Sequence, residues 1–234
     1  MNLIDRCVVL ILAFYVLAGI YRGFLPTVLS LISNVVSWGT AMLFMPLMAN
    51  AVKANAGMFN MLLYYSEGSE FIGDVELART SVDALSSSQV ASVIEGSGLP
   101  YPFAKEIQQN IANRAFQNIN ISTLGDYFNQ TIVCVVINII VFIIIFAIVR
   151  IILGLIINGT DYAIKLPRLR QYDSLTGAGF GLIRGIMALF VIFMVVPLIL
   201  IAMDFDFIHQ ILNSSLFAPF FYHSSILLSM IPGA

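Results

Sequence analysis

The stretch IVCVVINIIVFIIIFAIVRIILGLII, residues 132–157, decides the fold because it is almost wholly aliphatic and its only charge is Arg150. About 20 residues, each rising about 1.5 Å, cross the roughly 30 Å hydrocarbon core of a bilayer, so this stretch predicts a transmembrane helix. If the helix enters the membrane near Ile132, Arg150 lies about 27 Å along it and is expected to snorkel to the opposite headgroups. The sequence therefore predicts an integral membrane protein.

Three further apolar runs accompany this stretch, and together they predict an all-α polytopic membrane protein with about four transmembrane helices. They are Cys7–Ile20, extended by Leu3 and Ile4, then Phe24–Met48, then Leu175–Met203. A secretory signal peptide is a rival interpretation of the first run, because Val16-Leu17-Ala18 offers small residues for cleavage before Gly19. The basic region of such a peptide is lacking, since Asp5 cancels Arg6, and a helical hairpin is favoured.

The fourth apolar run is too long for one simple crossing and is interrupted by Arg184. We expect Ile186–Met203, about 27 Å of helix, to cross the membrane. Thr176–Ile183 contains three glycines, Gly177, Gly179 and Gly181. It is expected to form a separate short segment that lies in the interface or dips into it.

Between the second and third runs the chain turns polar and acidic, which predicts a soluble insert with amphipathic helices at Glu76–Ile94 and Phe103–Ile119. Basic residues concentrate in the connections after the first and third spans, so these connections are expected in the cytoplasm, with the insert and both termini outside. The predicted organisation is a transmembrane hairpin (1–52), an acidic helical extracytoplasmic insert (53–129), two transmembrane helices joined by a basic cytoplasmic loop (130–203) and an amphipathic interfacial tail (204–234).

The composition argues against several classes of function. With 59% hydrophobic residues, 10% charged residues and a net charge of -2, the chain has no basic field that would attract nucleic acid. Cys7 and Cys134 lack the spacing of metal ligands, His209 and His223 are interpreted as interfacial polar tips, and no metal or cofactor is predicted. No acid pair, HExxH motif or nucleophile with a base occurs in the spans, so an enzyme is not expected. The expected partners are the lipid bilayer and either another membrane protein or a second copy of the chain.

A glycine–arginine pattern occurs twice, as Gly19-Ile20-Tyr21-Arg22-Gly23 and as Gly181-Leu182-Ile183-Arg184-Gly185. A guanidinium in lipid costs roughly 2.5 to 3.5 kcal/mol on insertion scales, so each arginine is expected at an interface, in a hydrated cavity or against a partner. One interpretation makes both arginines anchors on lipid phosphates, with glycines that permit a turn or close packing. The other brings the motifs together around a cavity. Because each copy precedes a crossing, we also interpret the repeat as a shared hinge.

The candidate functional residues are those of the two motifs and the acids that could pair with their arginines. The motif residues are Gly19, Arg22, Gly23, Gly177, Gly181, Arg184 and Gly185, and the acids are Asp5, Asp161 and Asp173. Under the predicted topology Asp5 lies across the membrane from the motifs, which leaves Asp161 and Asp173 as partners for Arg184. A polar stripe on the second span suits close helix packing or a hydrated groove, and it consists of Ser30, Ser33, Asn34, Ser37 and Thr40.

At these motifs the chain resembles the colicin V production protein family of small bacterial inner-membrane proteins. The resemblance rests on Ile4-Asp5 before an apolar run, on Gly19-x-x-Arg22-Gly23-Phe24, and on Leu175-Thr176-Gly177-x-x-x-Gly181-x-x-Arg184-Gly185. It covers mainly residues 1–48 and 132–203. The resemblance implies a polytopic protein of the inner membrane associated with toxin production or export and envelope homeostasis, and it supplies no catalytic residues.

Two hypotheses of function follow from the sequence. The first is a membrane scaffold that helps to assemble or export other factors and docks them on the insert and the aromatic tail. The second is an oligomeric channel or small transporter whose site is framed by the two motifs, since glycine-interrupted segments in two halves of a chain often mark a substrate site. Arginines that face lipid headgroups would favour the scaffold, and arginines that converge on an enclosed hydrated cavity would favour the channel.

Overall fold

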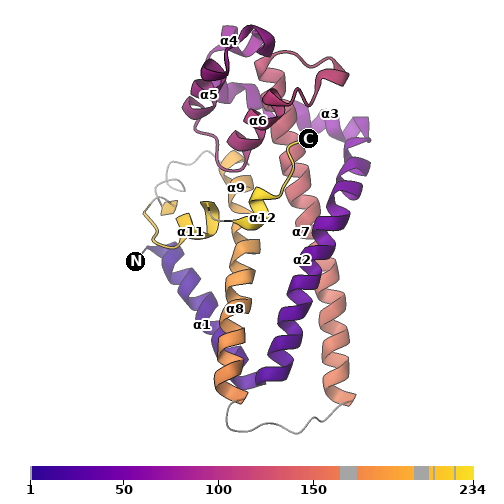
Figure 1. Ribbon diagram of the computed structural model, residues 1–234, viewed down its shortest axis with the longest axis vertical. Helices are drawn as coiled ribbons and strands as arrows, with labels where there is room; N and C mark the ends of the chain where they lie inside the picture. The colour runs from indigo at the N-terminus through magenta and orange to yellow at the C-terminus, as the bar shows by residue number, and fades with distance from the viewer. Residues whose placement is uncertain (1, 164–172, 203–210, 213, 224) are drawn as a thin grey trace. The chain divides into compact units, whose positions relative to one another are not determined.

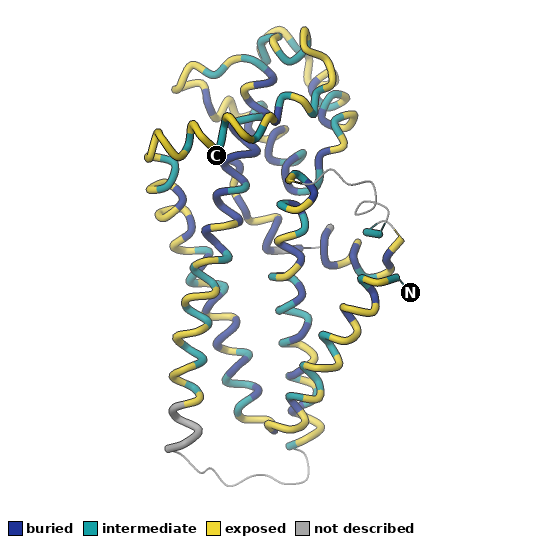
Figure 2. Tube along the Cα trace, turned by 180° about the vertical axis from the view of Figure 1, so that it is seen from behind, coloured by how far each residue is buried: buried dark blue, intermediate teal, exposed yellow. Residues whose placement is uncertain are grey.

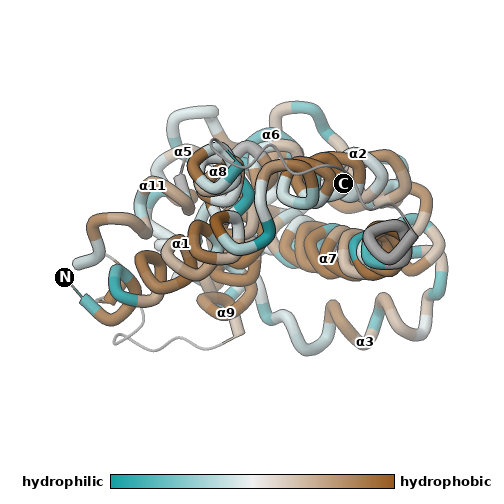
Figure 3. The backbone as a smooth tube through the Cα atoms, turned by 90° about the horizontal axis from the view of Figure 1, so that it is seen from below, coloured by the Kyte–Doolittle hydropathy of each residue, from teal (hydrophilic) through white to brown (hydrophobic). Residues whose placement is uncertain are grey.

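The structure, a computed structural model, describes residues 2–163, 173–202, 211–212, 214–223 and 225–234, except for the side chains of 159–163, His223 and Ile226. Four helical stretches in these ranges are long and apolar enough to cross a membrane, and they are Leu3–Arg22, Phe24–Lys53, Leu124–Asn158 and Asp173–Ala202. Figure 3 shows that these helices are hydrophobic over most of their length. The prediction of an all-α polytopic membrane protein is confirmed.

The chain forms two compact units. Unit 1 consists of Met1–Met45, Phe142–Val196 and Asp204–Ser225. Unit 2 consists of Pro46–Val141, Pro197–Met203 and Ile226–Ala234. The four-part organisation expected from the sequence stays a prediction.

Helices α1 (Leu3–Arg22) and α2 (Phe24–Lys53) are joined by Gly23 alone. Gly23 has a φ of 83°, in the left-handed region that glycine adopts without a steric penalty. One continuous helix is blocked here by Pro26, which has no N–H to donate to the carbonyl of Arg22 and whose ring would collide with it. Only the first copy of the motif therefore forms a turn.

Helix α7 (Leu124–Ala163) contains the predicted third span and begins before it. Its 40 residues correspond to about 60 Å at about 1.5 Å per residue, which is longer than a bilayer core needs. The early start follows from Thr123, whose Oγ accepts a hydrogen bond from the backbone N–H of Asp126 at 3.2 Å and so caps the helix. The helix thus begins within the region that the sequence assigned to the insert.

The fourth apolar run contradicts the expected division at Arg184. Helix α8 (Asp173–Phe193) continues through the second motif without a break, and the chain turns only at residues 194–195, before helix α9 (Val196–Ala202). The expectation of a separate segment at Thr176–Ile183, and with it the shared hinge, was wrong. The break falls where it does because Pro197 removes a backbone donor and its ring collides with the carbonyl of Phe193.

Helices α1 and α8 lie side by side in unit 1 (Figure 1). In α1 the buried residues are Asp5, Val8 and Gly19. The rest of this helix is partly or fully exposed, as the trace in Figure 2 shows. A helix with one narrow buried strip and an exposed aliphatic remainder suits a position against lipid.

Unit 2 contains most of the region between α2 and α7, which folds into short helices. They are α3 (Ala56–Ser66), η1 (Gly68–Ile72), α4 (Val75–Arg79), η2 (Val82–Ala84), α5 (Ser87–Gly96), α6 (Phe103–Ala112) and η3 (Gln117–Ile119). The single helix expected at Glu76–Ile94 is therefore divided into three, because Ser81 and Ser86 cap new helices with their side chains. The helix expected at Phe103–Ile119 ends at Ala112.

The described part of the tail forms α11 (Ala218–His223) in unit 1 and α12 (Ile226–Ser229) in unit 2. In unit 1, Phe190 and Phe193 of α8 contact Phe221 of α11, with ring centroids 5.3 and 5.4 Å apart. The interfacial tail expected at residues 204–234 stays a prediction. His209 lies outside the described residues, as does the side chain of His223.

Candidate functional site: an arginine cavity

The two glycine motifs meet where α1 and α8 pack together. Gly177, Gly181 and Gly185 are all buried and recur every fourth residue, so they lie on one face of α8. Gly19 of α1 faces this strip: a Cβ built on it would lie 2.9 Å from the carbonyl carbon of Gly177 and 3.2 Å from the Cα of Gly181. The backbones of the two helices therefore approach as closely as glycine permits, which is the close-packing role suggested by the sequence.

Arg184 stands beside this glycine seam and is held by an aromatic ring. Its guanidinium carbon lies 5.0 Å from the ring centroid of Tyr15 on α1, within the range of a cation–π interaction. Its Nε is buried and has no hydrogen-bond partner among the described residues. A buried N–H without an acceptor is costly. Within the described part of the chain, Arg184 therefore retains an unused donor.

Arg150 of α7 points to α2 and does not simply snorkel to headgroups. Its Nη2 donates to Ser30 Oγ at 2.9 Å and its Nη1 donates to Ser33 Oγ at 3.1 Å. Both serines are buried. The polar stripe on α2 thus supplies two hydroxyls, one turn apart, that fix the plane of this guanidinium.

A cavity of about 210 Å³ lies in unit 1 where these arginines come together, and we call it the arginine cavity. Its lining residues come from α1, α2, α7 and α8, and they are Arg22, Pro26, Ser30, Arg150, Gly154, Ile157, Asn158 and Arg184. None of these lining residues is acidic. The two ion pairs found among the described residues, Lys105–Glu106 and Arg114–Asp83, lie elsewhere.

The three acids expected near the arginines have different places. Asp173 begins α8, and its Oδ1 accepts a hydrogen bond from the backbone N–H of Phe24 at 2.6 Å. It therefore caps the start of α2, beside Gly23 of the first motif. The side chain of Asp161 lies outside the described residues.

Asp5, the third acid, is fully buried near the start of α1 and binds the tail. Its Oδ1 accepts hydrogen bonds from Ser215 Oγ at 2.7 Å and from the backbone N–H groups of Leu216 at 3.0 Å and Phe217 at 3.2 Å. Its Oδ2 accepts from the backbone N–H of Asn2 at 3.1 Å, which completes a capping box. Asp5 therefore holds residues 215–217 to the first turn of α1.

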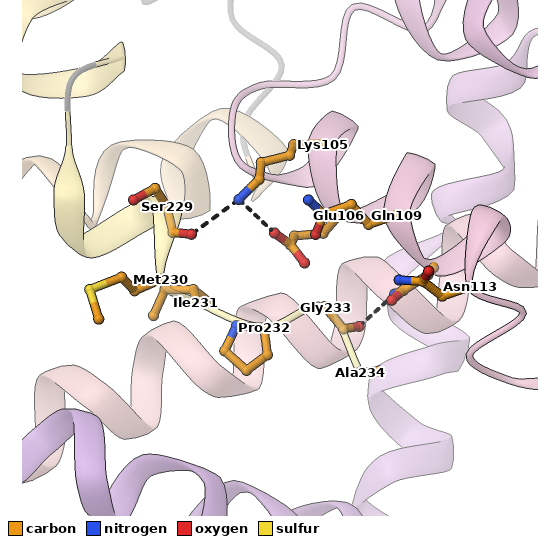
Figure 4. A pocket seen from close by; sticks show the side chains of 11 residues that line it. Lys105, Glu106, Gln109, Asn113, Ser229, Met230, Ile231, Pro232, Gly233 and Ala234 are labelled. Atoms are coloured by element: carbon orange, nitrogen blue, oxygen red, sulfur yellow. Dashed lines mark hydrogen bonds and ion pairs between the residues drawn. The ribbon is translucent and has the colours of Figure 1, made fainter.

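A second cavity, of about 280 Å³, lies in unit 2 between α6 and residues 229–234 (Figure 4). Lys105 Nζ donates to the carbonyl of Ser229 at 3.0 Å and lies 3.3 Å from Glu106 Oε1. Asn110 Nδ2 donates to the carbonyl of Gly233 at 2.9 Å. These polar groups hold residues 229–234 against α6.

Sequence reasoning missed Arg150, Pro26, Ser30, Gly154 and Asn158 as members of the candidate site. Two signals pointed to part of this set. Arg150 is the only charge in the stretch 132–157, and Ser30 belongs to the polar stripe on the second span. The sequence does not show that these two features face each other. No group of three or more His, Cys, Asp or Glu side chains in the described residues is placed to hold a metal ion.

Residues 103–225 match the family model for the colicin V production protein. The match includes α7, α8 and the second motif, whereas the first motif and the hairpin of α1 and α2 precede it. No curated protein and no solved structure matches the chain.

Proposed function

Because the chain belongs to the colicin V production protein family, we propose that it is an inner-membrane scaffold that supports toxin production or export and envelope homeostasis. In this proposal the insert and both termini lie outside the cytoplasm, as the basic residues of the short connections predict. The family is not a known family of enzymes, and the proposal includes no catalytic step.

The observation that supports a scaffold is the surface of α3 in unit 2. This helix has no buried residue, and its exposed large side chains are Met58, Met61, Tyr64 and Tyr65. Tyrosine and methionine are enriched at protein interfaces, where they supply large contact areas. A short helix that is apolar and uncovered within its own unit is suited to dock a protein partner.

The scaffold is tested with Tyr64→Cys, treated on intact spheroplasts with a membrane-impermeant maleimide that carries a photoreactive diazirine. We expect a discrete protein adduct of reproducible mass, because Tyr64 is 77% exposed. Ser88→Cys on the polar surface of α5, also exposed, is the matched control and should be labelled without forming that adduct. If Tyr64→Cys is labelled but forms adducts with lipid only, the scaffold proposal is contradicted. If neither position is labelled, the proposed location of the insert outside the cytoplasm is contradicted.

A second candidate, an oligomeric anion channel or transporter, is favoured by the convergence of Arg22, Arg150 and Arg184 on one cavity. Cationic side chains that line a pore or cavity select for anions. The cavity in one copy of the chain is small, so this candidate requires several copies to assemble.

The channel is tested by chloride and phosphate flux into proteoliposomes. If the arginines frame the path, Arg184→Ala should reduce the flux at least about tenfold, which corresponds to about 1.4 kcal/mol of lost interaction. Arg6→Ala, an exposed arginine on the first turn of α1, should leave it unchanged. If Arg184→Ala does not alter the flux, this candidate loses its support.

A further inference from the structure

We propose that the arginine cavity is a binding site for a phosphate-type oxyanion. The inference goes beyond the scaffold and requires no transport. It concerns the part of unit 1 where α1, α2, α7 and α8 meet, and it rests on charge, on hydrogen-bond donors, on size and on position along the spans.

The arginine cavity gathers three like charges, because Arg22, Arg150 and Arg184 all line it. No acid lines the cavity among the residues that the structure describes. Like charges in surroundings of low dielectric constant raise the free energy of the folded state. An oxyanion between the arginines would remove this repulsion.

The arginine cavity supplies hydrogen-bond donors. An arginine has five N–H donors, and Arg150 uses one on Ser30 and one on Ser33, which leaves the others for a ligand. Arg184 contributes a buried Nε that has no partner in the described part of the chain. Arginine binds phosphate with two parallel hydrogen bonds, and this geometry makes it the preferred residue for such groups. The cavity thus offers more donors than the described residues satisfy.

Two of the three arginines are held in place before a ligand arrives. Ser30 and Ser33 fix the plane of Arg150, and the ring of Tyr15 supports Arg184. Preorganised groups lose little conformational entropy on binding. A surface cluster of long basic side chains would lack these supports.

The arginine cavity has a size and a position that suit such an anion. A cavity of about 210 Å³ holds the volume of about seven waters at roughly 30 Å³ each, so a tetrahedral oxyanion fits with part of its hydration. Arg22 is the last residue of α1, and Pro26 lies in the first turn of α2. The cavity therefore lies toward the ends of these two helices, where a lipid phosphate and a phosphate in water are both within reach.

The experiment measures binding to the purified full chain in a neutral detergent. In one arm, calorimetry follows titration with inorganic phosphate. In the other arm, native mass spectrometry follows retention of phosphatidylglycerol from nanodiscs of phosphatidylcholine that contain it. Binding in the first arm alone identifies a free phosphate, and selective retention in the second arm alone identifies a lipid headgroup.

The variants are chosen to separate charge from shape. Arg22→Gln removes one exposed guanidinium, and we expect binding to weaken about tenfold or more. Gly154→Leu keeps every arginine and fills the space beside Arg150, since a Cβ at Gly154 would already lie 3.5 Å from Arg150 Nη1. It should weaken binding by a similar factor. Arg6→Gln, at the other end of α1, is the matched control and should bind like the unmodified chain.

Each variant must keep its helical circular dichroism and a single elution peak, and Arg22→Gln is expected to do so because Arg22 is exposed. Two outcomes overturn the proposal. One is that neither phosphate nor phosphatidylglycerol binds selectively. The other is that Arg6→Gln lowers binding as much as Arg22→Gln and Gly154→Leu do, because the attraction would then be a diffuse charge effect.

Discussion

Substitution of Gly181 or Gly19 by alanine is expected to destabilise the packing of α1 on α8 by roughly 1–3 kcal/mol, the usual cost of overpacking a close contact. A Cβ at Gly181 would lie 2.5 Å from the carbonyl oxygen of Tyr15, and a Cβ at Gly19 would meet the carbonyl of Gly177. Backbone atoms cannot rotate away, so the helices must separate. This cost opposes the gain of up to about 1 kcal/mol that alanine brings over glycine within a helix.

Gly179→Ala is the matched control because it lies on the same helix, is exposed, and has nothing within 4 Å of its built Cβ. It should be neutral or stabilising by up to about 1 kcal/mol. Thermal unfolding in detergent measures the stabilities, and spin labels on α1 and α8 measure the distance between the helices. Equal behaviour of Gly181→Ala and Gly179→Ala would show that the glycine seam has no packing role.

Asp5→Ala is expected to release the tail from α1 and to lower stability by roughly 2–4 kcal/mol, since hydrogen bonds to a charged group contribute about 1.5–3 kcal/mol each and are not additive. The variant leaves Ser215 Oγ and the N–H groups of Leu216 and Phe217 without their acceptor. Asp5→Asn keeps one acceptor oxygen but places an amide where Asn2 donates. It should lie between the alanine variant and the unmodified chain.

Hydrogen–deuterium exchange at Leu216 and Phe217 checks this expectation, together with thermal unfolding. Asp74→Ala is the matched control, because Asp74 is an exposed N-cap that accepts only local bonds from Glu76 and Leu77. It should cost about 1 kcal/mol or less and leave exchange at Leu216 and Phe217 unchanged. Unchanged exchange in Asp5→Ala as well would contradict the role assigned to Asp5.

The membrane spans were predictable because their signal is local. A run of about 20 apolar residues has few alternatives to a spanning helix. Helix boundaries were less predictable, since Thr123 extends α7 and Pro197 moves the break in the fourth run beyond Arg184. The glycines before Arg184 suggested an irregular segment, because glycine is unfavourable within the helices of soluble proteins. In a membrane such glycines favour close packing of regular helices instead.

The candidate site was predictable only in part, because its residues come from helices far apart in the sequence. The repeated motif identified Arg22 and Arg184, and the alternative in which the motifs meet at a cavity agrees with their place in unit 1. Arg150 was expected to reach the lipid headgroups. The hydrophobic pattern predicts how deep a residue lies in the membrane, but it does not predict which residue of another helix it faces. Asp5 was sought as an ionic partner, whereas its donors are a hydroxyl and backbone amides about 210 residues away.

The link between Asp5 and residues 215–217 also sets an order of events during biosynthesis. A chain is made from its amino end, so α1 is synthesised long before α8 and the tail. Until then α1 lacks both the glycine face against which it packs and the donors that surround its carboxylate. The first helix to be made is therefore among the last to reach its final contacts, and a chain that ends before Ser215 lacks the donors that surround the Asp5 carboxylate.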